Sequence, residues 1–134
     1  QQLAPSDIIA FYFSAHWCPP CRQFTPLLRK FVDLLNAAGD YSLKIIFVSS
    51  DKSETEMWKY MSEEHGNWLA LTYGSSQRDQ LSSKYSVSGI PSLMVINGAG
   101  QSVVPHAVQI VIQAMQNSTT QVFKTMFDWR TASG

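Results

Sequence analysis

Two cysteines stand between a short apolar segment and a long amphipathic one. Residues 8–13, Ile-Ile-Ala-Phe-Tyr-Phe, are rich in β-forming side chains and suit a strand buried on both faces. From Phe24 to Leu35, apolar residues recur at three- and four-residue spacing, which is typical of one face of an α-helix that can end at Gly39. Cys18 and Cys21 therefore fall at a strand-to-helix junction.

The rest of the chain continues to alternate between strand and helix patterns. After the first helix, the predicted elements are a strand over 43–48, a helix capped by Ser53, a strand over 68–72, a helix over 78–85, strands over 92–96 and 101–104, and a helical segment over 107–129 interrupted near Asn117. Asn97-Gly98 is a strong hairpin signal, whereas the earlier alternation implies parallel pairing. We therefore expect an α/β fold in which helices flank both faces of a central mixed β-sheet, in a single domain over residues 1–134.

Composition and charge argue against two classes of partner. Ten Lys and Arg residues balance ten Asp and Glu residues, so the formal net charge is zero. Nucleic acids and anionic membranes attract proteins with a clear basic excess. No apolar run approaches the roughly 18 residues of a membrane-spanning helix. We expect neither nucleic acid nor a membrane as a partner.

Cysteine usage bears on the compartment. The chain has only two cysteines, and secreted domains that depend on disulfides usually carry more. The segment Gln1 to Ala4 shows no signal-peptide pattern. We therefore expect a cytoplasmic location, with the nucleus as a second one. A monomer is also expected.

The strand-to-helix junction gives the two cysteines different chemical roles. Free backbone N–H groups and the helix dipole favour negative charge at a helix start, so Cys18 is placed to form the thiolate that attacks disulfides. Cys21 lies one turn later and can attack the resulting mixed disulfide. Pro19 and Pro20 suit the first helical turn and stiffen it, and Trp17 would add a contact surface for substrate.

Three other interpretations of the cysteine pair are a structural disulfide, half of a zinc site and two inert thiols. A disulfide between residues so close in sequence closes a short loop and stabilises little. Zinc normally takes four ligands, and His16, His65 and His106 are scattered along the sequence. We therefore favour a redox-active dithiol and expect no metal. Its cycle needs no cofactor beyond the Cys18–Cys21 disulfide.

Four more residues are candidates for the site. Pro91 precedes a predicted strand, where a cis proline facing the cysteines and an ordinary trans proline are equally good interpretations of the spacing. If Pro91 is cis and faces the cysteines, the Ile90 backbone could pair with an extended substrate. Arg22 could stabilise the thiolate or contact substrate, and His16 could tune Cys18, although both also suit a solvated surface.

Five short motifs follow one another along the chain. They are Tyr-Phe-Ser-Ala-His-Trp-Cys-Pro-Pro-Cys-Arg at 12–22, Phe-Thr-Pro at 24–26, Phe-Val-Ser-Ser-Asp at 47–51, Trp-Leu-Ala-Leu at 68–71 and Gly-Ile-Pro at 89–91. Together they resemble the thioredoxin superfamily, and more closely its tryparedoxin and nucleoredoxin group, from Ile8 to Gly100. The resemblance implies a thioredoxin fold, an attacking Cys18, a resolving Cys21 and a cis Pro91.

The sequence departs from ordinary thioredoxins at Tyr12, which stands where they have a buried acid that moves protons near the dithiol. This substitution is typical of tryparedoxins. Beyond Val103 the match is poor. Asp51 is expected to end a strand and help cap a helix, and Trp58, Trp68 and Trp129 are expected to pack in the core or at its edge.

The resemblance implies a thiol–disulfide oxidoreductase that reduces disulfides in proteins or small molecules. An external thiol donor or reductase would complete the cycle, with thioredoxin reductase, glutathione and trypanothione as candidates. A redox-gated protein-binding module of nucleoredoxin type, with little turnover, is the alternative hypothesis. A disulfide former or isomerase in an oxidising compartment is a third.

Overall fold

The computed structural model describes residues 3–134. Gln1 and Gln2, the first two residues of the Gln1–Ala4 segment considered above, lie outside the described residues. Its elements in chain order are β1 (Ile8–Ser14), α1 (Pro19–Ala37), β2 (Leu43–Ser49), α2 (Glu54–Glu64), β3 (Leu69–Ala70), α3 (Ser76–Lys84), β4 (Ser92–Ile96), α4 (Ala107–Asn117) and α5 (Thr119–Ser133). Every predicted element except the strand over 101–104 is present. Within the described residues, no helix is long and apolar enough to cross a membrane.

The strands form one mixed sheet in the order β3-β2-β1-β4. β1 runs parallel to β2, which places Tyr12 beside Phe47, and β2 runs parallel to the short β3. β4 lies antiparallel on the other side of β1, where Leu93 is paired with Tyr12. The predicted central mixed sheet is therefore confirmed.

The predicted strand over 101–104 is wrong. After the turn, only a single bridge joins Ile96 to Ser102, supported by a hydrogen bond from the Val103 N–H to the Val95 carbonyl at 2.9 Å. Pro105 has no N–H to extend the ladder, and α4 begins shortly afterwards. The turn at Asn97-Gly98 therefore forms, but no regular strand follows it.

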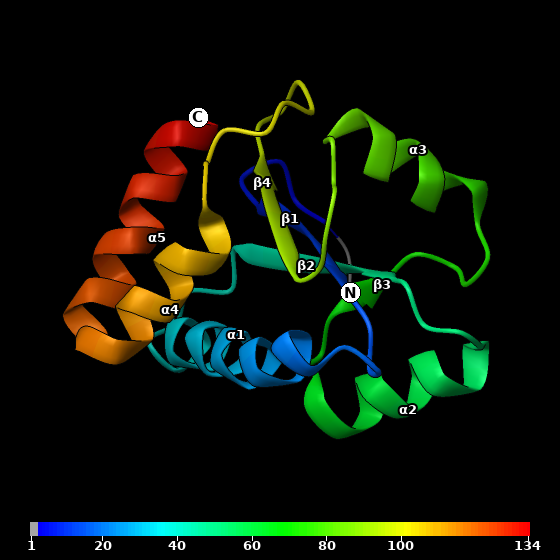
Figure 1. The fold of residues 1–134 in the computed structure, drawn as a ribbon. Helices are drawn as coiled ribbons and strands as arrows, with labels where there is room; N and C mark the ends of the chain where they lie inside the picture. Colours follow the sequence, from blue (N-terminus) through cyan, green and yellow to red (C-terminus); the bar gives the residue numbers. More distant parts are fainter. Residues whose placement is uncertain (1–2) are drawn as a thin grey trace.

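The two faces of the sheet are covered unequally. On one face, residues such as Ala10 and Tyr12 are buried against α1, α4, α5 and α2, whereas α3 lies on the opposite side (Figure 1). Ile9 and Phe11 point to that opposite side and are only half-buried, and no residue of α3 is itself buried. The prediction of helices on both faces is confirmed. The expectation that β1 is fully buried on both faces is wrong.

The longest element of the described fold is α1, which begins between the two cysteines. Its apolar side buries Phe24, Leu28 and Phe31 against the sheet, as the spacing predicted. It continues without a break through Pro26 and ends beside Gly39, whose φ of 87° is a conformation that glycine adopts without strain.

The last two helices complete the core. The break between α4 and α5 falls at Ser118, whose hydroxyl accepts a hydrogen bond from the Gln121 N–H and so caps α5. Trp129 of α5 is 2% exposed, and its ring lies 5.5 Å from that of Phe31. Trp58 is 56% exposed on α2, so the expectation that it packs in the core or at its edge is wrong.

Trp129→Ala should lower the free energy of unfolding by about 3–5 kcal/mol, because it leaves a large cavity between α5 and α1. Urea denaturation followed by circular dichroism measures this change. The matched control Trp58→Ala removes the same side chain from an exposed position and should change the free energy by less than about 0.5 kcal/mol. Equal losses in the two variants would contradict the placement of α5.

His65, just after α2, is buried in an aromatic environment. Its ring centroid lies 4.4 Å from those of Phe47 and Tyr60 and 4.8 Å from that of Trp68. Within the described residues, neither ring nitrogen has a hydrogen-bond partner. Burial, with a smaller effect from the charge of Arg29, lowers the pKa of His65 to about 3. The imidazole is therefore neutral at neutral pH.

The depressed pKa of His65 makes folding sensitive to acid. In the unfolded chain a histidine takes up a proton below about pH 6.5, whereas folded His65 does so only near pH 3. Stability is therefore lost as the pH falls through this window. Compared with wild type, His65→Phe should lose roughly 3 kcal/mol less between about pH 7 and about pH 4 in urea denaturation. An identical pH dependence in both proteins would show that His65 takes up its proton in the folded protein, which contradicts the lowered pKa.

Candidate active site

The two cysteines occupy the first turn of α1, and both are free thiols. Cys18 is the N-cap residue, and its Sγ accepts a hydrogen bond from the Cys21 backbone N–H at 3.4 Å. The Cys18 thiol in turn donates to the Ile90 carbonyl at 3.8 Å. The first sulfur thus faces a backbone N–H of the helix start, one of the groups that have no partner within the helix.

Cys21 is held differently from Cys18. It is completely buried, whereas Cys18 retains 4% of its surface. Burial, together with a hydrogen bond to the Cys18 side chain, raises the pKa of Cys21 to about 12, although Ser14 and the backbone at Ala15 act in the opposite direction. At neutral pH the second thiol of the reduced protein is therefore protonated.

The loop before β4 lies beside the dithiol. The Ile90–Pro91 peptide bond is cis, as predicted, and Ile90 packs against the buried cluster of Ala15, Cys18 and Cys21. Pro91 also borders an open groove of about 390 Å³ between α1 and α4. Its other lining residues are Pro20, Gln23, Phe24, Leu27, Val108, Gln109 and Ile112. An apolar surface therefore adjoins the helix turn of Pro19 and Pro20.

Trp17 presents its ring to solvent next to Cys18. The side chain is 52% exposed, and its indole N–H donates to the Ser50 carbonyl at 2.9 Å. The Lys52 ammonium lies 5.9 Å from the ring centroid, within the range of a cation–π contact. These contacts hold the indole in one orientation, so it offers a defined apolar surface beside the sulfur.

Arg22 is an exposed residue of α1. Its backbone N–H donates to the Cys18 carbonyl at 3.0 Å as part of the helix. Within residues 3–134, its guanidinium forms no ion pair. The role suggested for this guanidinium at the thiolate stays a prediction.

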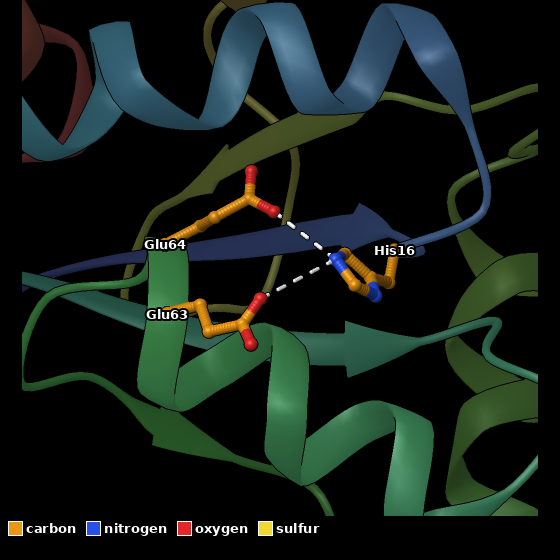
Figure 2. A group of neighbouring side chains, drawn as sticks. All are labelled: His16, Glu63 and Glu64. Carbon is orange, nitrogen blue, oxygen red and sulfur yellow. Dashed lines mark ion pairs between the residues drawn. The ribbon is translucent and has the colours of Figure 1, made fainter.

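The His16 ring is directed toward α2 (Figure 2). Nε2 lies 3.2 Å from Glu64 and 3.8 Å from Glu63, Nδ1 lies 3.5 Å from Glu56, and the ring stacks on Tyr60 at 5.2 Å. His16, Glu63 and Glu64 are also the described residues whose ligand atoms are close enough to hold a metal ion. The cluster ties the active-site loop to α2, and the expectation of no metal stays a prediction.

Asp51 is a site residue whose role the sequence analysis misjudged. Its buried carboxylate accepts the His16 backbone N–H at 2.7 Å and the Ser49 hydroxyl at 2.7 Å. It does not cap α2, because Ser53 accepts the Glu56 N–H at 3.1 Å instead. The sequence did contain a signal for this role. Asp51 follows closely after β2, which is parallel to β1, and parallel strands end at the same edge of the sheet.

Four buried hydroxyl groups lie behind the dithiol, and none was a candidate site group in the sequence analysis. Tyr12 and Thr25 are 2.6 Å apart, Ser14 and Tyr60 are 2.6 Å apart, and Thr25 also bonds Tyr60. Burial raises the pKa of Tyr60 to about 12 and that of Tyr12 well above its ordinary value. Both phenols are therefore neutral at neutral pH.

A dithiol that caps a helix on a mixed sheet of this order places the chain in the thioredoxin fold class. The family model described as thioredoxin-like matches residues 6–102, and the chain belongs to this family of oxidoreductases. The match ends before α4 and α5, in agreement with the poor resemblance beyond Val103.

Relatives in the nucleoredoxin and tryparedoxin groups support the assignment. Nucleoredoxin of Bos taurus is 42% identical over 94 residues, which are 69% of this chain and 21% of the relative. Tryparedoxin of Trypanosoma brucei brucei is 36% identical over 66% of this chain and 60% of its own length. The structure of a thioredoxin from Wuchereria bancrofti superposes with a TM-score of 0.76 at 39% identity, covering 94% of this chain and 83% of that one. The chain spans about a fifth of the nucleoredoxins it matches.

Asp51→Ala should destabilise the fold by about 1–3 kcal/mol, because it leaves the partly buried His16 N–H and the buried Ser49 hydroxyl without their acceptor. Urea denaturation measures the loss. Asp79→Ala is the matched control, since this acid is exposed on α3 and, among residues 3–134, forms its ion pair with Arg78 at the surface. A loss no larger than that of the control would contradict the role assigned to Asp51.

Proposed function

We propose that the protein is a thiol–disulfide oxidoreductase that reduces disulfides through Cys18 and Cys21. The observation that carries this proposal is the unequal placement of the two thiols. Cys18 caps a helix and keeps some exposure, whereas Cys21 is buried behind it. This placement suits a reaction in which Cys18 meets the substrate disulfide first and Cys21 acts afterwards.

The reaction follows from this order. The Cys18 thiolate attacks one sulfur of the substrate disulfide, forms a mixed disulfide and releases the first substrate thiolate, which takes a proton from solvent. Cys21 then loses its proton and attacks the Cys18 sulfur, so that the Cys18–Cys21 disulfide forms and the second substrate thiol leaves. Two electrons pass from the dithiol to the substrate, and each sulfur released ends as a thiol.

The surface around Cys18 suits a disulfide within an extended protein segment. The exposed Trp17 ring and the groove beside Pro91 offer apolar contacts on two sides of the sulfur. The Ile90 carbonyl lies at the sulfur itself, where the backbone of an added strand could pair with it. We therefore propose Trp17, Pro19, Pro20, Ile90 and Pro91 as the substrate-contacting residues.

The oxidised enzyme requires an external electron source. We propose a low-molecular-weight thiol or a reductase as donor, with glutathione, trypanothione and thioredoxin reductase as the candidates to compare. Beyond the redox-active disulfide, the cycle uses no bound cofactor. A monomer acting in the cytoplasm is the form we propose.

Reduction of insulin with dithiothreitol as electron source tests the proposed activity. Wild type should exceed the uncatalysed rate, and Cys18→Ser should return to it because the attacking sulfur is absent. When reduced Cys21→Ser is mixed with insulin after dithiothreitol has been removed, it should instead retain the substrate as a mixed disulfide on Cys18, visible by mass spectrometry.

Wild-type turnover equal to that of Cys18→Ser would contradict the reductase. The alternative, a redox-gated binding module, would then be favoured if partner affinity changed when the dithiol was oxidised. Lys124→Gln, which alters an exposed residue of α5 that does not line the groove beside Pro91, serves as the matched control and should retain wild-type turnover.

A further inference from the structure

A lysine lies against the exposed ring of Trp17, next to the first cysteine. The Lys52 ammonium is 5.9 Å from the centroid of the Trp17 ring, and both side chains are exposed. At this distance the ring attracts the cation, and the attraction limits the positions that a long, flexible side chain occupies. A positive charge is therefore held on the surface that we propose for substrate contact.

The segment that carries Lys52 is fixed to the loop that carries Cys18. Lys52 lies between β2 and α2. Two residues earlier, the Ser50 N–H donates to the Ser14 carbonyl at 2.9 Å, and the Ser50 carbonyl accepts the Trp17 indole N–H at 2.9 Å. The ring and the segment that carries the lysine are therefore joined by a hydrogen bond as well as by the cation–π contact.

Asp51, directly before Lys52, is held through both its side chain and its main chain. Its carboxylate accepts the His16 N–H at 2.7 Å, and its carbonyl accepts the Tyr73 hydroxyl at 3.0 Å. The backbone from which the Lys52 side chain extends is therefore held in place before any substrate binds. Such preorganisation lowers the entropy that binding must otherwise offset.

The acids that follow Lys52 in the sequence have other partners. Glu54 accepts the Trp58 indole N–H at 3.3 Å, and Glu56 lies 3.5 Å from the His16 ring. Within residues 3–134, the Lys52 ammonium forms no ion pair. Its N–H donors are therefore available to a carboxylate from another molecule.

The charge of Lys52 is opposite to the charges that α2 directs at the active-site loop. Glu63 and Glu64 of this helix converge on the ring of His16, which directly precedes Trp17 (Figure 2). Without the lysine, an acidic substrate would meet the negative charge of this helix, and like charges disfavour association. Lys52 therefore decides whether an acidic or a basic segment is favoured beside the ring.

We propose that Lys52 is a specificity-determining residue that binds a carboxylate beside the reacting disulfide, so that the protein prefers protein segments with an acidic side chain next to the cysteine that Cys18 attacks. This inference rests on the proposed reductase function. In the complex, the flanking residue of the substrate lies on the Trp17 ring, and its carboxylate accepts a hydrogen bond from the ammonium. Because this pair lies at the exposed rim of the contact surface, it acts mainly on the rate of association.

Three matched peptide disulfides test this preference. Each is the symmetrical disulfide of a tripeptide X-Cys-Gly that is acetylated and amidated, where X is glutamate, glutamine or lysine. Excess peptide is mixed with the reduced protein after dithiothreitol has been removed, and samples quenched with acid give the second-order rate constant by mass spectrometry. One Cys18–Cys21 disulfide forms for each peptide disulfide that is reduced to two thiols.

Lys52→Gln should lower the rate constant with the glutamate peptide about three- to fivefold and leave that with the glutamine peptide unchanged. Lys52→Glu should favour the lysine peptide over the glutamate peptide. The ratio of wild-type to variant rate is compared for each peptide, because this ratio cancels the intrinsic reactivity of the three disulfides. In about 1 M salt the ratios should approach one, since the Debye length falls to about 3 Å.

Lys30→Gln is the matched control. It removes the same charge from an exposed residue of α1 that lies about 18 Å along the helix from Cys18, at 1.5 Å per residue. Its ratios should be close to one for all three peptides. Lys52 is exposed as well, so its variants should fold, and near-ultraviolet circular dichroism verifies that they do.

Each outcome has one meaning. A loss in Lys52→Gln that is confined to the glutamate peptide and disappears in about 1 M salt supports the inference. Equal ratios for the three peptides, a preference that persists in salt, or the same loss in Lys30→Gln overturns it while leaving the reductase intact. A wild-type protein that reduces none of the peptides overturns the inference, and if insulin is not reduced either, the proposed function fails as well.

Discussion

The central position of β1 determines where every group of the site lies. Because β1 runs parallel to β2, both strands end at one edge of the sheet, so Asp51 lies beside the loop that leads to Cys18. Because β4 is antiparallel, its first residues reach the same edge and bring Pro91 there. One strand thus gathers a dithiol, a proline loop and a buried acid from three distant parts of the chain.

This arrangement divides the two thiols between different environments. Cys18 receives the free N–H groups of the helix start, whereas Cys21 faces the interior of the protein. In that interior the hydroxyls of Tyr12, Ser14, Thr25 and Tyr60 bond one another, so their burial is compensated by hydrogen bonds between neutral groups.

The helices beyond the family match are integral to the fold. The matched region ends at residue 102, yet Trp129 of α5 packs on Phe31 of the helix that begins at the dithiol. Core packing needs an apolar side chain of suitable size and not a particular motif, so this region can diverge in sequence and still support α1. On the opposite face of the sheet lies α3, and none of its residues is buried.

The sequence by itself determined the helices, the four strands of the sheet, the cysteine pair at the start of α1 and, through the family resemblance, the cis bond at Pro91, although it also predicted a strand over 101–104 that does not form. These features depend on neighbouring residues, whose propensities and periodicity can be read directly. It could not show that the His16 ring faces α2, that Asp51 holds the loop, or that Ser14 and Tyr60 share a hydrogen bond. Only the tertiary structure decided these contacts, because they join groups 35 to 46 positions apart whose meeting depends on strand order and helix docking.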